Sequence, residues 1–432
     1  MSTEKPREIA VRLLKRHADG TGWLEDLLEA ELSKGSLAPA DRALVQELAF
    51  GVVRWQATLD WLIALKTQGR PQKTLLQILL RLGLYQLFWL DRIPDHAAVH
   101  ESVQIARDLR FGPQAGFVNA VLRGCLRERA LLERELQDLK RHTPHLGWSH
   151  PQWLCERWEQ RWGQEKLRAL LEWNNTPPSV FIRVNTLKST PENLAMQFEK
   201  EGVLFTPRSF DWTPQEIVFE LRGHPPLSTL PSFQQGWFYV QDPSTLLAVR
   251  ELNPQPGENI LDLCAAPGGK TTLIAQLMEN RGMIVAQDIE AGRRRMIEEN
   301  CARLGVNCVR IIEPCELNAQ NQAPQFDRIL VDAPCSNTGV MRRRVELRWR
   351  IQLAEIERLR VVQLGLLRQA AALLKPGGTL VYSTCSLEPE ENSSVVKEFL
   401  GDTAGFACNQ ERELIPFIDG TDGAFVATLR KA

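Results

Sequence analysis

Two cysteines follow short apolar runs in the second half of the sequence. Cys335 closes the segment Asp332-Ala333-Pro334-Cys335, and Cys385 closes the segment Ser383-Thr384-Cys385. Cysteine is usually an inert small hydrophobic residue, and the other seven of the nine cysteines are interpreted in that way. These two differ because both runs predict parallel strands, and α/β folds build their sites just past the carboxyl ends of such strands. The sequence therefore predicts two thiols at one edge of a sheet.

Paired thiols beside a nucleoside-type cofactor suit the alkylation of a ring carbon. C5 of cytosine is a poor nucleophile, but addition of a thiolate at C6 makes C5 enamine-like and able to attack an electrophilic methyl group. The addition requires charge relief at the ring, which an acid or a lysine near N3 or O2 could supply. The C5 proton must then leave so that the thiolate is eliminated. One thiol would attack, and a second group would help to release the product.

A Gly-rich turn follows the first apolar run, Asn259–Leu263. It reads Cys264-Ala265-Ala266-Pro267-Gly268-Gly269-Lys270-Thr271-Thr272 and predicts a strand that turns directly into a helix. Glycines allow close backbone approach and a helix N-terminus offers free N–H groups, so we expect a nucleotide-like ligand here. The ending Gly269-Lys270-Thr271 resembles a Walker A motif, but Cys264 stands where that motif requires Gly. This difference excludes the ATPase interpretation.

Asp288 lies at the end of the second apolar run, Gly282–Gln287. An acid at the tip of the second strand commonly accepts hydrogen bonds from the ribose hydroxyls of a bound adenosine. The alternative is a cap for the helix that follows, which would be favoured if the position stood alone. The Gly-rich turn earlier in the chain favours the interpretation that Asp288 binds the ribose.

Apolar runs alternate with helical stretches from residue 243 to residue 432, and this alternation predicts a parallel, doubly wound α/β sheet. The predicted strands are Asn259–Leu263, Gly282–Gln287, Val309–Ile312, Arg328–Val331 and Thr379–Tyr382.

The first part of the chain predicts two further domains. Residues 1–141 carry apolar residues at helical spacing throughout and predict an all-α domain. Residues 142–242 combine linker helices and a helix at Pro191–Glu201 with short β-like runs, which predicts a small α+β module. The β-like runs are Ser179–Asn185, Glu216–Leu221 and Gly236–Val240.

The composition excludes several classes of protein. Lys and Arg number 52 and Asp and Glu 53, a net charge of −1 that argues against a uniformly basic nucleic-acid binder. Nine cysteines without any Cys-x-x-Cys pair exclude the usual zinc and redox motifs and indicate a reducing compartment. The richest apolar stretch, Leu75–Leu90, is too short to span a bilayer. We expect a cytoplasmic monomer with no metal and no membrane contact.

Three motifs in this order resemble the RNA 5-cytosine methyltransferases of the Nol/Nop/Sun family. They are Asp-Leu-Cys-Ala-Ala-Pro-Gly-Gly-Lys-Thr from Asp262, Asp-Ala-Pro-Cys-Ser-x-Thr-Gly from Asp332 and Ser-Thr-Cys-Ser-x-x-x-x-Glu-Asn from Ser383. The resemblance implies a class I, Rossmann-like methyltransferase domain in which Cys385 is the nucleophile. It implies that Cys335 assists breakdown of the covalent adduct. It also implies that Asp332 and Lys270 contact the target cytosine.

The same resemblance implies that S-adenosylmethionine is the cofactor. The residues expected to bind it are Cys264, Ala265, Ala266, Pro267, Gly268, Gly269, Lys270, Asp288, Arg293, Glu313 and Asp332. Two positions depart from the family. Glu313 follows the third predicted strand, where the family usually has an Asp at the adenine side, and Glu316 is an alternative. Asn337 replaces the commoner Gly, and Asn is the best non-Gly residue for a left-handed backbone.

The N-terminal region resembles the NusB-like helical domain of bacterial small-subunit ribosomal RNA methyltransferases. The similarity is carried by Asp41-Arg42-Ala43-Leu44-Val45, Gly83-Leu84-Tyr85-Gln86-Leu87, Arg92-Ile93-Pro94-Asp95-His96-Ala97-Ala98 and Val118-Asn119-Ala120-Val121-Leu122-Arg123. NusB-like domains bind RNA, so the resemblance implies a substrate-positioning element and small-subunit (16S) ribosomal RNA as the partner.

Other functions stay open from the sequence. A transfer RNA substrate would keep the enzyme class. An RNA-binding assembly factor with a vestigial methyltransferase domain is a second alternative, although the intact Cys335 and Cys385 argue against it. A nicotinamide-dependent oxidoreductase is disfavoured because the first loop lacks Gly-x-Gly-x-x-Gly.

An arginine run follows the Cys335 loop. The run comprises Arg342, Arg343, Arg344, Arg348 and Arg350. These residues are expected to contact RNA phosphates, because guanidinium groups match phosphate oxygens, although a charge run is usually only a solvated face. The tryptophans from Trp148 to Trp173 could stack on bases, but their spacing favours a helix that packs its aromatic side inward. His96 and His100 lack a third ligand nearby, so a cap or core role is expected for both.

Overall fold

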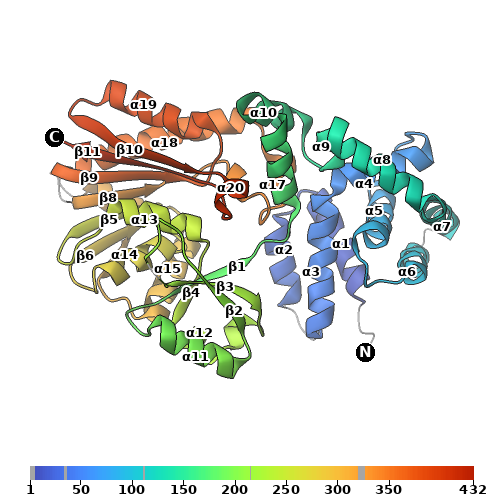
Figure 1. Ribbon diagram of the computed structural model, residues 1–432, viewed down its shortest axis with the longest axis horizontal. Coiled ribbons are helices and arrows are strands. Elements are labelled where there is room, and N and C mark those ends of the chain that lie inside the picture. Colours follow the sequence, from blue (N-terminus) through green and yellow to red (C-terminus); the bar gives the residue numbers. More distant parts are fainter. Residues whose placement is uncertain (1–4, 34–36, 110–111, 215, 320–325) are drawn as a thin grey trace. The chain divides into compact units, whose positions relative to one another are not determined.

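The computed structural model describes residues 5–33, 37–109, 112–214, 216–319 and 326–432 (Figure 1). The chain forms two compact units. One comprises Met1–Thr176 together with Met341–Arg350, and the other comprises Pro177–Val340 together with Ile351–Ala432. The first unit therefore runs past the domain boundary expected at residue 141, and it takes in a short segment from the last third of the chain.

The first unit is helical, as the apolar spacing predicted. Proline begins α1, α3 and α9, where its missing N–H costs no helical hydrogen bond. The helices are α1 (Pro6–Ala18), α2 (Leu24–Leu32), α3 (Pro39–Arg54), α4 (Gln56–Thr67), α5 (Thr74–Trp89), α6 (Asp95–Asp108), α7 (Gly112–Arg127), α8 (Arg129–His142), α9 (Pro144–Gly147), α10 (Gln152–Asn175) and α17 (Leu347–Arg350).

The core of this unit forms around α5. Leu79, Leu80, Leu82 and Leu84 are all buried, so α5 is surrounded by other helices on every side. Of the tryptophans predicted to pack inward, Trp158 of α10 is buried, whereas Trp148, Trp153, Trp162 and Trp173 are half-buried.

His96 and His100 do not fit the sequence prediction. Both side chains are exposed on α6, outside the core, and no cap hydrogen bond involves them. Among the described residues no group of three His, Cys, Asp or Glu side chains could hold a metal ion.

The segment Met341–Arg350 is anchored in the helical unit by a buried arginine. Arg348 donates from Nη1 to Oδ1 of Asn175 at 2.8 Å and to the carbonyl of Ser149 at 3.1 Å. Its Nη2 donates to the carbonyl of Asn174 at 3.1 Å. Burial, and then the charge of Arg54, lower the pKa of Arg348 to about 9. The segment is therefore a packed part of this unit, and the phosphate contact expected for the fully buried Arg348 is wrong.

Arg342 belongs to the same packed segment, so the phosphate contact expected for it is wrong in this structure. Its guanidinium lies 4.2 Å from the ring centroid of Trp173, and only 3% of the residue is exposed. A buried guanidinium stacked on an indole has no access to an RNA phosphate. Arg343 is half-buried and Arg344 is exposed.

The middle part of the chain forms a four-stranded antiparallel sheet in the second unit, in the order β2-β3-β1-β4. Its elements are β1 (Val180–Val184), α11 (Pro191–Glu201), β2 (Leu204–Arg208), β3 (Val218–Gly223), η1 (Leu227–Thr229), α12 (Pro231–Gln234) and β4 (Phe238–Val240). Phe198 packs edge-on against Phe219 and Phe238 to form the core. The sequence predicted β1, α11, β3 and β4 but not β2, whose residues are mostly exposed at the sheet edge.

A seven-stranded sheet forms the rest of this unit, in the order β10-β11-β9-β8-β5-β6-β7. Its strands are β5 (Asn259–Leu263), β6 (Met283–Gln287), β7 (Val309–Ile312), β8 (Phe326–Asp332), β9 (Leu374–Thr384), β10 (Phe406–Leu414) and β11 (Ala424–Lys431). The five predicted strands pair in parallel. Two strands that the sequence did not predict, β10 and β11, add an antiparallel edge to this parallel core.

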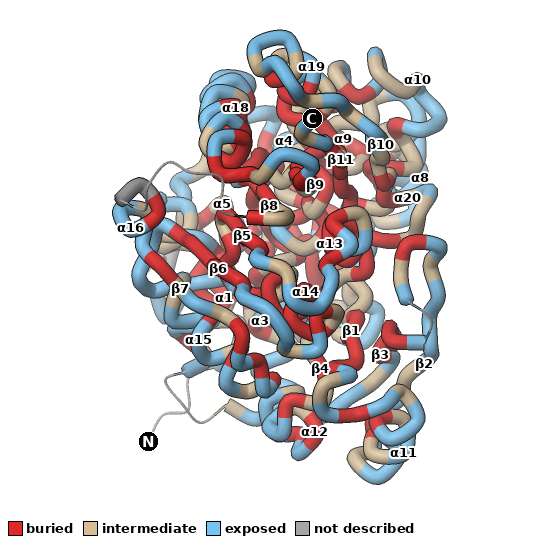
Figure 2. Tube along the Cα trace, turned by 90° about the vertical axis from the view of Figure 1, so that its left-hand side faces the viewer, coloured by how far each residue is buried: buried red, intermediate tan, exposed pale blue. Residues whose placement is uncertain are grey.

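Helices cover both faces of this sheet. Figure 2 shows β5, β6 and β8 buried along most of their length. Alternate residues of β5 enter different cores: Ile260 packs with α13, α14 and α15, whereas Leu261 packs with α18 and α19. The helices and short turns are η2 (Pro243–Thr245), α13 (Leu246–Leu252), α14 (Gly269–Leu277), α15 (Ala291–Leu304), α16 (Pro314–Ala319), η3 (Thr338–Val340), α18 (Leu353–Leu373), η4 (Pro389–Glu391), α19 (Ser393–Asp402) and α20 (Pro416–Asp419).

We predict that Arg348→Met destabilises the helical unit by roughly 2–4 kcal/mol, because it leaves several buried acceptors without a donor. Hydrogen exchange of peptides from α9 and α10, together with urea denaturation of the full chain, measures the effect. Arg344→Met is the matched control in the same segment and should change stability by less than about 0.5 kcal/mol. Equal exchange protection in both variants would contradict the anchoring role of Arg348.

Candidate functional site

Parallel pairing of β8 and β9 brings the two predicted thiols together. Asp332 pairs with Ser383 at the carboxyl ends of these strands, and each chain then turns out of the sheet. The Sγ atoms of Cys335 and Cys385 lie 3.3 Å apart, although the residues are 50 positions apart in sequence. Cys335 is buried, whereas Cys385 is partly exposed. Cys385 is therefore the thiol that is more open to a substrate.

The thiols differ in their hydrogen bonds as well. Cys385 donates from Sγ to Oδ1 of Asn337 at 3.0 Å. For Cys335, the hydrogen bond with Cys385 and then burial raise the pKa well above that of a free thiol. Cys335 is therefore held as a neutral thiol at physiological pH, and it would be the stronger base once ionised.

Asn337 occupies the left-handed region of backbone conformation, with φ of 58°. Gly and Asn adopt this conformation most readily, so Asn337 preserves the turn although it stands where the family usually has Gly. Nδ2 donates to the carbonyl of Cys335 at 2.6 Å, which directs Oδ1 toward Cys385. The sequence pointed to the backbone conformation but gave no sign of this bridge between the two cysteine segments.

A lysine–aspartate pair lies at the same sheet edge. Nζ of Lys270 donates to Oδ2 of Asp332 at 2.7 Å, and the hydroxyl of Ser383 donates to Oδ1 at 2.8 Å. Burial disfavours the charged lysine, but the carboxylate of Asp332 outweighs it, so the pKa of Lys270 is raised. Lys270 is therefore a cation, and about a third of the Asp332 side chain remains exposed to a ligand.

The Gly-rich turn has the features expected of a cofactor cradle. Gly268 has φ of 98° and precedes α14 without a side-chain cap, so the first N–H groups of α14 are available to a ligand. A Cβ atom at Gly269 would lie 2.9 Å from the ring of Tyr239. Arg183 of β1 supports the turn from below, donating to the carbonyl of Gly269 at 3.0 Å and to the hydroxyl of Thr272 at 3.1 Å.

Asp288 lies beside this turn. Oδ2 accepts from the N–H of Ala266 at 3.2 Å and lies 3.6 Å from a guanidinium nitrogen of Arg293. Cys264 has a left-handed backbone, and burial raises the pKa of its thiol to about 12, so it is neutral at pH 7. The cradle, the uncapped helix and the adjacent carboxylate fit an adenosine-type group.

The two candidate glutamates after β7 have different partners. Oε1 of Glu316 accepts from the N–H of Glu313 at 3.0 Å, which is the capping of a helix start. Glu313 forms an ion pair with Arg294 and is exposed at the strand end. Of the two, Glu313 has the carboxylate that is free of backbone capping.

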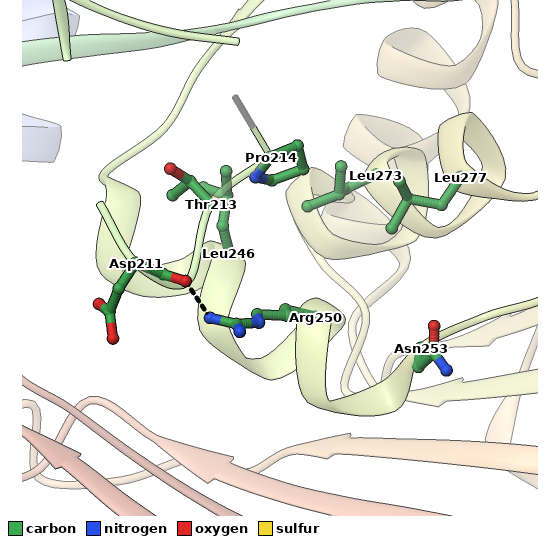
Figure 3. Close-up of a pocket in the computed structure, with 8 residues that line it drawn as sticks. All are labelled: Asp211, Thr213, Pro214, Leu246, Arg250, Asn253, Leu273 and Leu277. Carbon is green, nitrogen blue, oxygen red and sulfur yellow. Dashed lines mark hydrogen bonds between the residues drawn. The ribbon is translucent and has the colours of Figure 1, made fainter. Parts of the chain in front are cut away.

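A cavity of about 300 Å³ lies away from the predicted residues (Figure 3). Its lining contains none of them: Asp211, Thr213, Pro214, Leu246, Arg250, Asn253, Leu273 and Leu277. Arg250 donates across it to the carbonyl of Asp211 (Figure 3).

No single described helix is long and apolar enough to cross a membrane. Helices α3 and α4, which meet at a sharp bend, reach the length and apolar composition of a membrane span only when they are taken together.

Three family models match the chain in the order of the expected domains. A NusB family model matches residues 4–127, an RsmF/B-like ferredoxin-like domain matches residues 150–220, and the 16S rRNA methyltransferase RsmB/F model matches residues 249–430. The ferredoxin-like match covers α10, β1, α11, β2 and the start of β3.

Curated relatives are similar over the full chain. The probable ribosomal RNA small subunit methyltransferase B of Bacillus subtilis is 33% identical, with 100% of each chain covered. The ribosomal RNA small subunit methyltransferase B of Klebsiella pneumoniae is 38% identical, with 98% of each chain covered.

Solved structures share the architecture. A crystal structure titled PH0851 has a TM-score of 0.79 at 25% identity and covers 99% of both chains. NSun6 from Pyrococcus horikoshii with SFG has a TM-score of 0.58 at 26% identity and covers 65% of this chain and 98% of that one.

The buried carboxyl of Asp262 beneath the Gly-rich turn generates a pH prediction. It accepts from the hydroxyl of Thr271 at 2.6 Å, and burial raises its pKa to about 7. The folded state thus favours the neutral acid, and this stabilisation is full below about pH 4 and is lost as the pH rises to about 7. Relative to Asp262→Asn, the wild-type free energy of unfolding should fall by roughly 2–4 kcal/mol across this window.

Urea denaturation at several pH values measures the difference. Asp327→Asn is a control of opposite sign. Burial acts against ionisation of Asp327, but hydrogen bonds from Lys375 and the N–H of Asn259, together with the charges of Lys375 and Arg328, lower its pKa. The free energy of unfolding of wild type, relative to that of Asp327→Asn, should therefore increase as the pH rises. A difference between wild type and Asp262→Asn that does not change with pH would refute the assignment.

Proposed function

Because the chain belongs to the RsmB/F family of 16S rRNA methyltransferases, we propose from the site geometry how its residues methylate C5 of cytosine in that RNA. The family uses S-adenosylmethionine, and a covalent cysteine adduct is typical of it. One observation carries the residue roles: two thiols 3.3 Å apart share a sheet edge with the Lys270–Asp332 pair.

Cys385 is the nucleophile and Cys335 the group that assists release. Cys385 is the more exposed thiol, so its sulfur can reach C6 of a base that has left its stack. The attack forms an S–C6 bond and places electron density on C5, which then takes the methyl group. Removal of the C5 proton breaks the S–C6 bond and restores the ring. The C5 proton passes to solvent as the S–C6 electron pair returns to sulfur. The neutral thiol of Cys335, whose Sγ lies 3.3 Å from that of Cys385, can donate its proton to the departing thiolate of Cys385.

Lys270 and Asp332 orient and polarise the cytosine. The partly exposed carboxylate of Asp332 can accept a hydrogen bond from the 4-amino group of the base, and from N3 when that nitrogen is protonated. The ammonium of Lys270 stabilises negative charge that develops on the ring as the thiolate adds. Their direct contact at 2.7 Å holds the two groups as a unit.

When bound, S-adenosylmethionine supplies the electrophilic methyl group. Residues of the turn Cys264–Lys270 would hold it against the N-terminus of α14, and Asp288 would accept from the ribose hydroxyls. Glu313 would take the adenine side, with Arg293 at the edge of the site. Asp332 lies where the turn and the cysteine loops meet.

The helical unit and the exposed Arg344 would contact the RNA. Arg344 is the fully exposed member of the arginine run, and Arg343 is half-buried beside it. All nine cysteines are free, which supports a reducing compartment and hence the cytoplasm. The monomeric state stays a prediction.

Cys385→Ala should abolish transfer of labelled methyl groups to 16S rRNA, because no thiolate is left to add at C6. Cys335→Ala should instead accumulate a protein–RNA adduct on a denaturing gel, since addition proceeds and elimination stalls. Cys408→Ala is the control. It removes a thiol of the edge strand β10 that is not part of the site, and it should keep full activity. Wild-type turnover by Cys385→Ala would exclude the assigned nucleophile.

Arg344→Ala should weaken binding of 16S rRNA and reduce the slope of log affinity against log salt by about one. Filter binding over a series of salt concentrations measures both. Arg358→Ala removes an exposed arginine that pairs with Glu355 on α18, and it serves as the control. Identical slopes for Arg344→Ala and wild type would show that Arg344 meets no phosphate.

A further inference from the structure

A single carboxylate binds the residues that follow both thiols. Ser336 comes directly after Cys335, and Ser386 comes directly after Cys385. Both hydroxyls donate to Oε2 of Glu391, and the N–H of Ser336 donates to Oε1 at 2.8 Å. The two hydroxyls also lie 3.0 Å from each other. Glu391 therefore links the two cysteine loops through the positions adjacent to the sulfurs.

The scaffold fixes this carboxylate in place. Glu391 has no exposed surface, and Nε2 of Gln363 on α18 donates to its Oε1 at 3.1 Å. The same Nε2 donates to the carbonyl of Pro334 at 3.0 Å. The hydroxyl of Tyr382 in β9 donates to the backbone carbonyl of Glu391 at 2.5 Å. Helix α18 thus holds the carboxylate, and β9 holds the backbone of the same residue.

A buried carboxylate is costly unless donors satisfy it. Burial raises the pKa of Glu391, whereas hydrogen bonds from Ser336, Ser386 and Gln363 lower it. Ser336, Ser386 and Gln363 all donate to the carboxylate, and a buried carboxylate with its acceptors satisfied in this way fixes local geometry. The contacts of Glu391 go to the serines beside the sulfurs, so its influence on the thiols is positional.

We propose that Glu391 is a positioning residue that sets the separation and orientation of Cys335 and Cys385. This role rests on the proposed use of both thiols in catalysis. Without the carboxylate, the two loops lose their shared acceptor and the sulfurs sample other positions. A displacement of about 1 Å at reacting groups can cost a factor of about 100 in rate.

Disulfide closure in the RNA-free full chain measures the thiol geometry directly. A diazenedicarboxamide oxidant takes up two hydrogens and becomes the hydrazine, while the two S–H bonds break and the Cys335–Cys385 disulfide forms. Wild type should close readily, because its sulfurs are in contact. Glu391→Ala should close at least about tenfold more slowly, as followed by peptide mass spectrometry. Glu357→Ala, which removes an exposed carboxylate from α18, should close at the wild-type rate.

Glu391→Gln separates the carboxylate from the shape of the side chain. Its amide oxygen can still accept from the N–H of Ser336, and the serine hydroxyls can rotate to accept from its amide nitrogen. We expect its closure rate to lie between those of wild type and Glu391→Ala. If Glu391→Ala fails to fold, the double variant Ser336→Ala with Ser386→Ala provides the same test, because it removes the hydroxyl links and leaves Glu391.

Catalysis gives a second readout. Glu391→Ala should lower kcat by roughly 10- to 100-fold, while its KM for S-adenosylmethionine changes by less than about threefold, since the cofactor turn is untouched. Closure at the wild-type rate by both Glu391→Ala and the double serine variant overturns the positioning role. Because closure requires neither RNA nor cofactor, slow closure together with inactive wild-type protein would overturn the proposed function and leave the positioning role standing.

Discussion

The parallel pairing of β8 with β9 is the constraint on which the site depends. Neighbouring parallel strands end at the same edge of a sheet, so residues far apart in sequence emerge side by side. The register that pairs Asp332 with Ser383 places the following cysteines with their sulfurs 3.3 Å apart. The same register lets the hydroxyl of Ser383 bind Asp332, the carboxylate that holds Lys270. A slip of one residue would turn one of these side chains to the opposite face.

The two thiols have different surroundings, and this difference separates their roles. Cys335 is buried, and its pKa is raised by Cys385 and by burial. Cys385 is partly exposed and donates to an amide that is itself held by the carbonyl of Cys335. A fold that needed only two inert hydrophobic residues would not require this bridge. The polar groups around the sulfurs, including the buried carboxylate of Glu391, are satisfied by one another and fix a single arrangement.

The sequence allowed the parallel core to be predicted, because each buried strand is an apolar run between helical stretches. It also placed both cysteines at the correct sheet edge. The antiparallel strands β10 and β11 escaped prediction. Strand β10 is largely exposed and has no apolar run. Strand β11 begins with a short buried apolar run that was not recognised as a strand. The Glu391 contacts were not predictable, because a carboxylate in a polar stretch is usually solvated. The arginine run was misread at Arg342 for the related reason that tertiary packing buries it on Trp173.

The central claim is that Cys385, held beside Cys335 by the sheet, forms the bond to the base. The direct measurement uses 16S rRNA carrying 5-fluorocytidine, in which fluorine replaces the C5 proton so that elimination is blocked after methyl transfer. Wild-type protein is incubated with this RNA and S-adenosylmethionine, denatured and digested, and the modified peptide is sequenced by mass spectrometry. The predicted result is an RNA adduct on the peptide containing Cys385. An adduct on the Cys335 peptide would contradict the assignment of the two thiols.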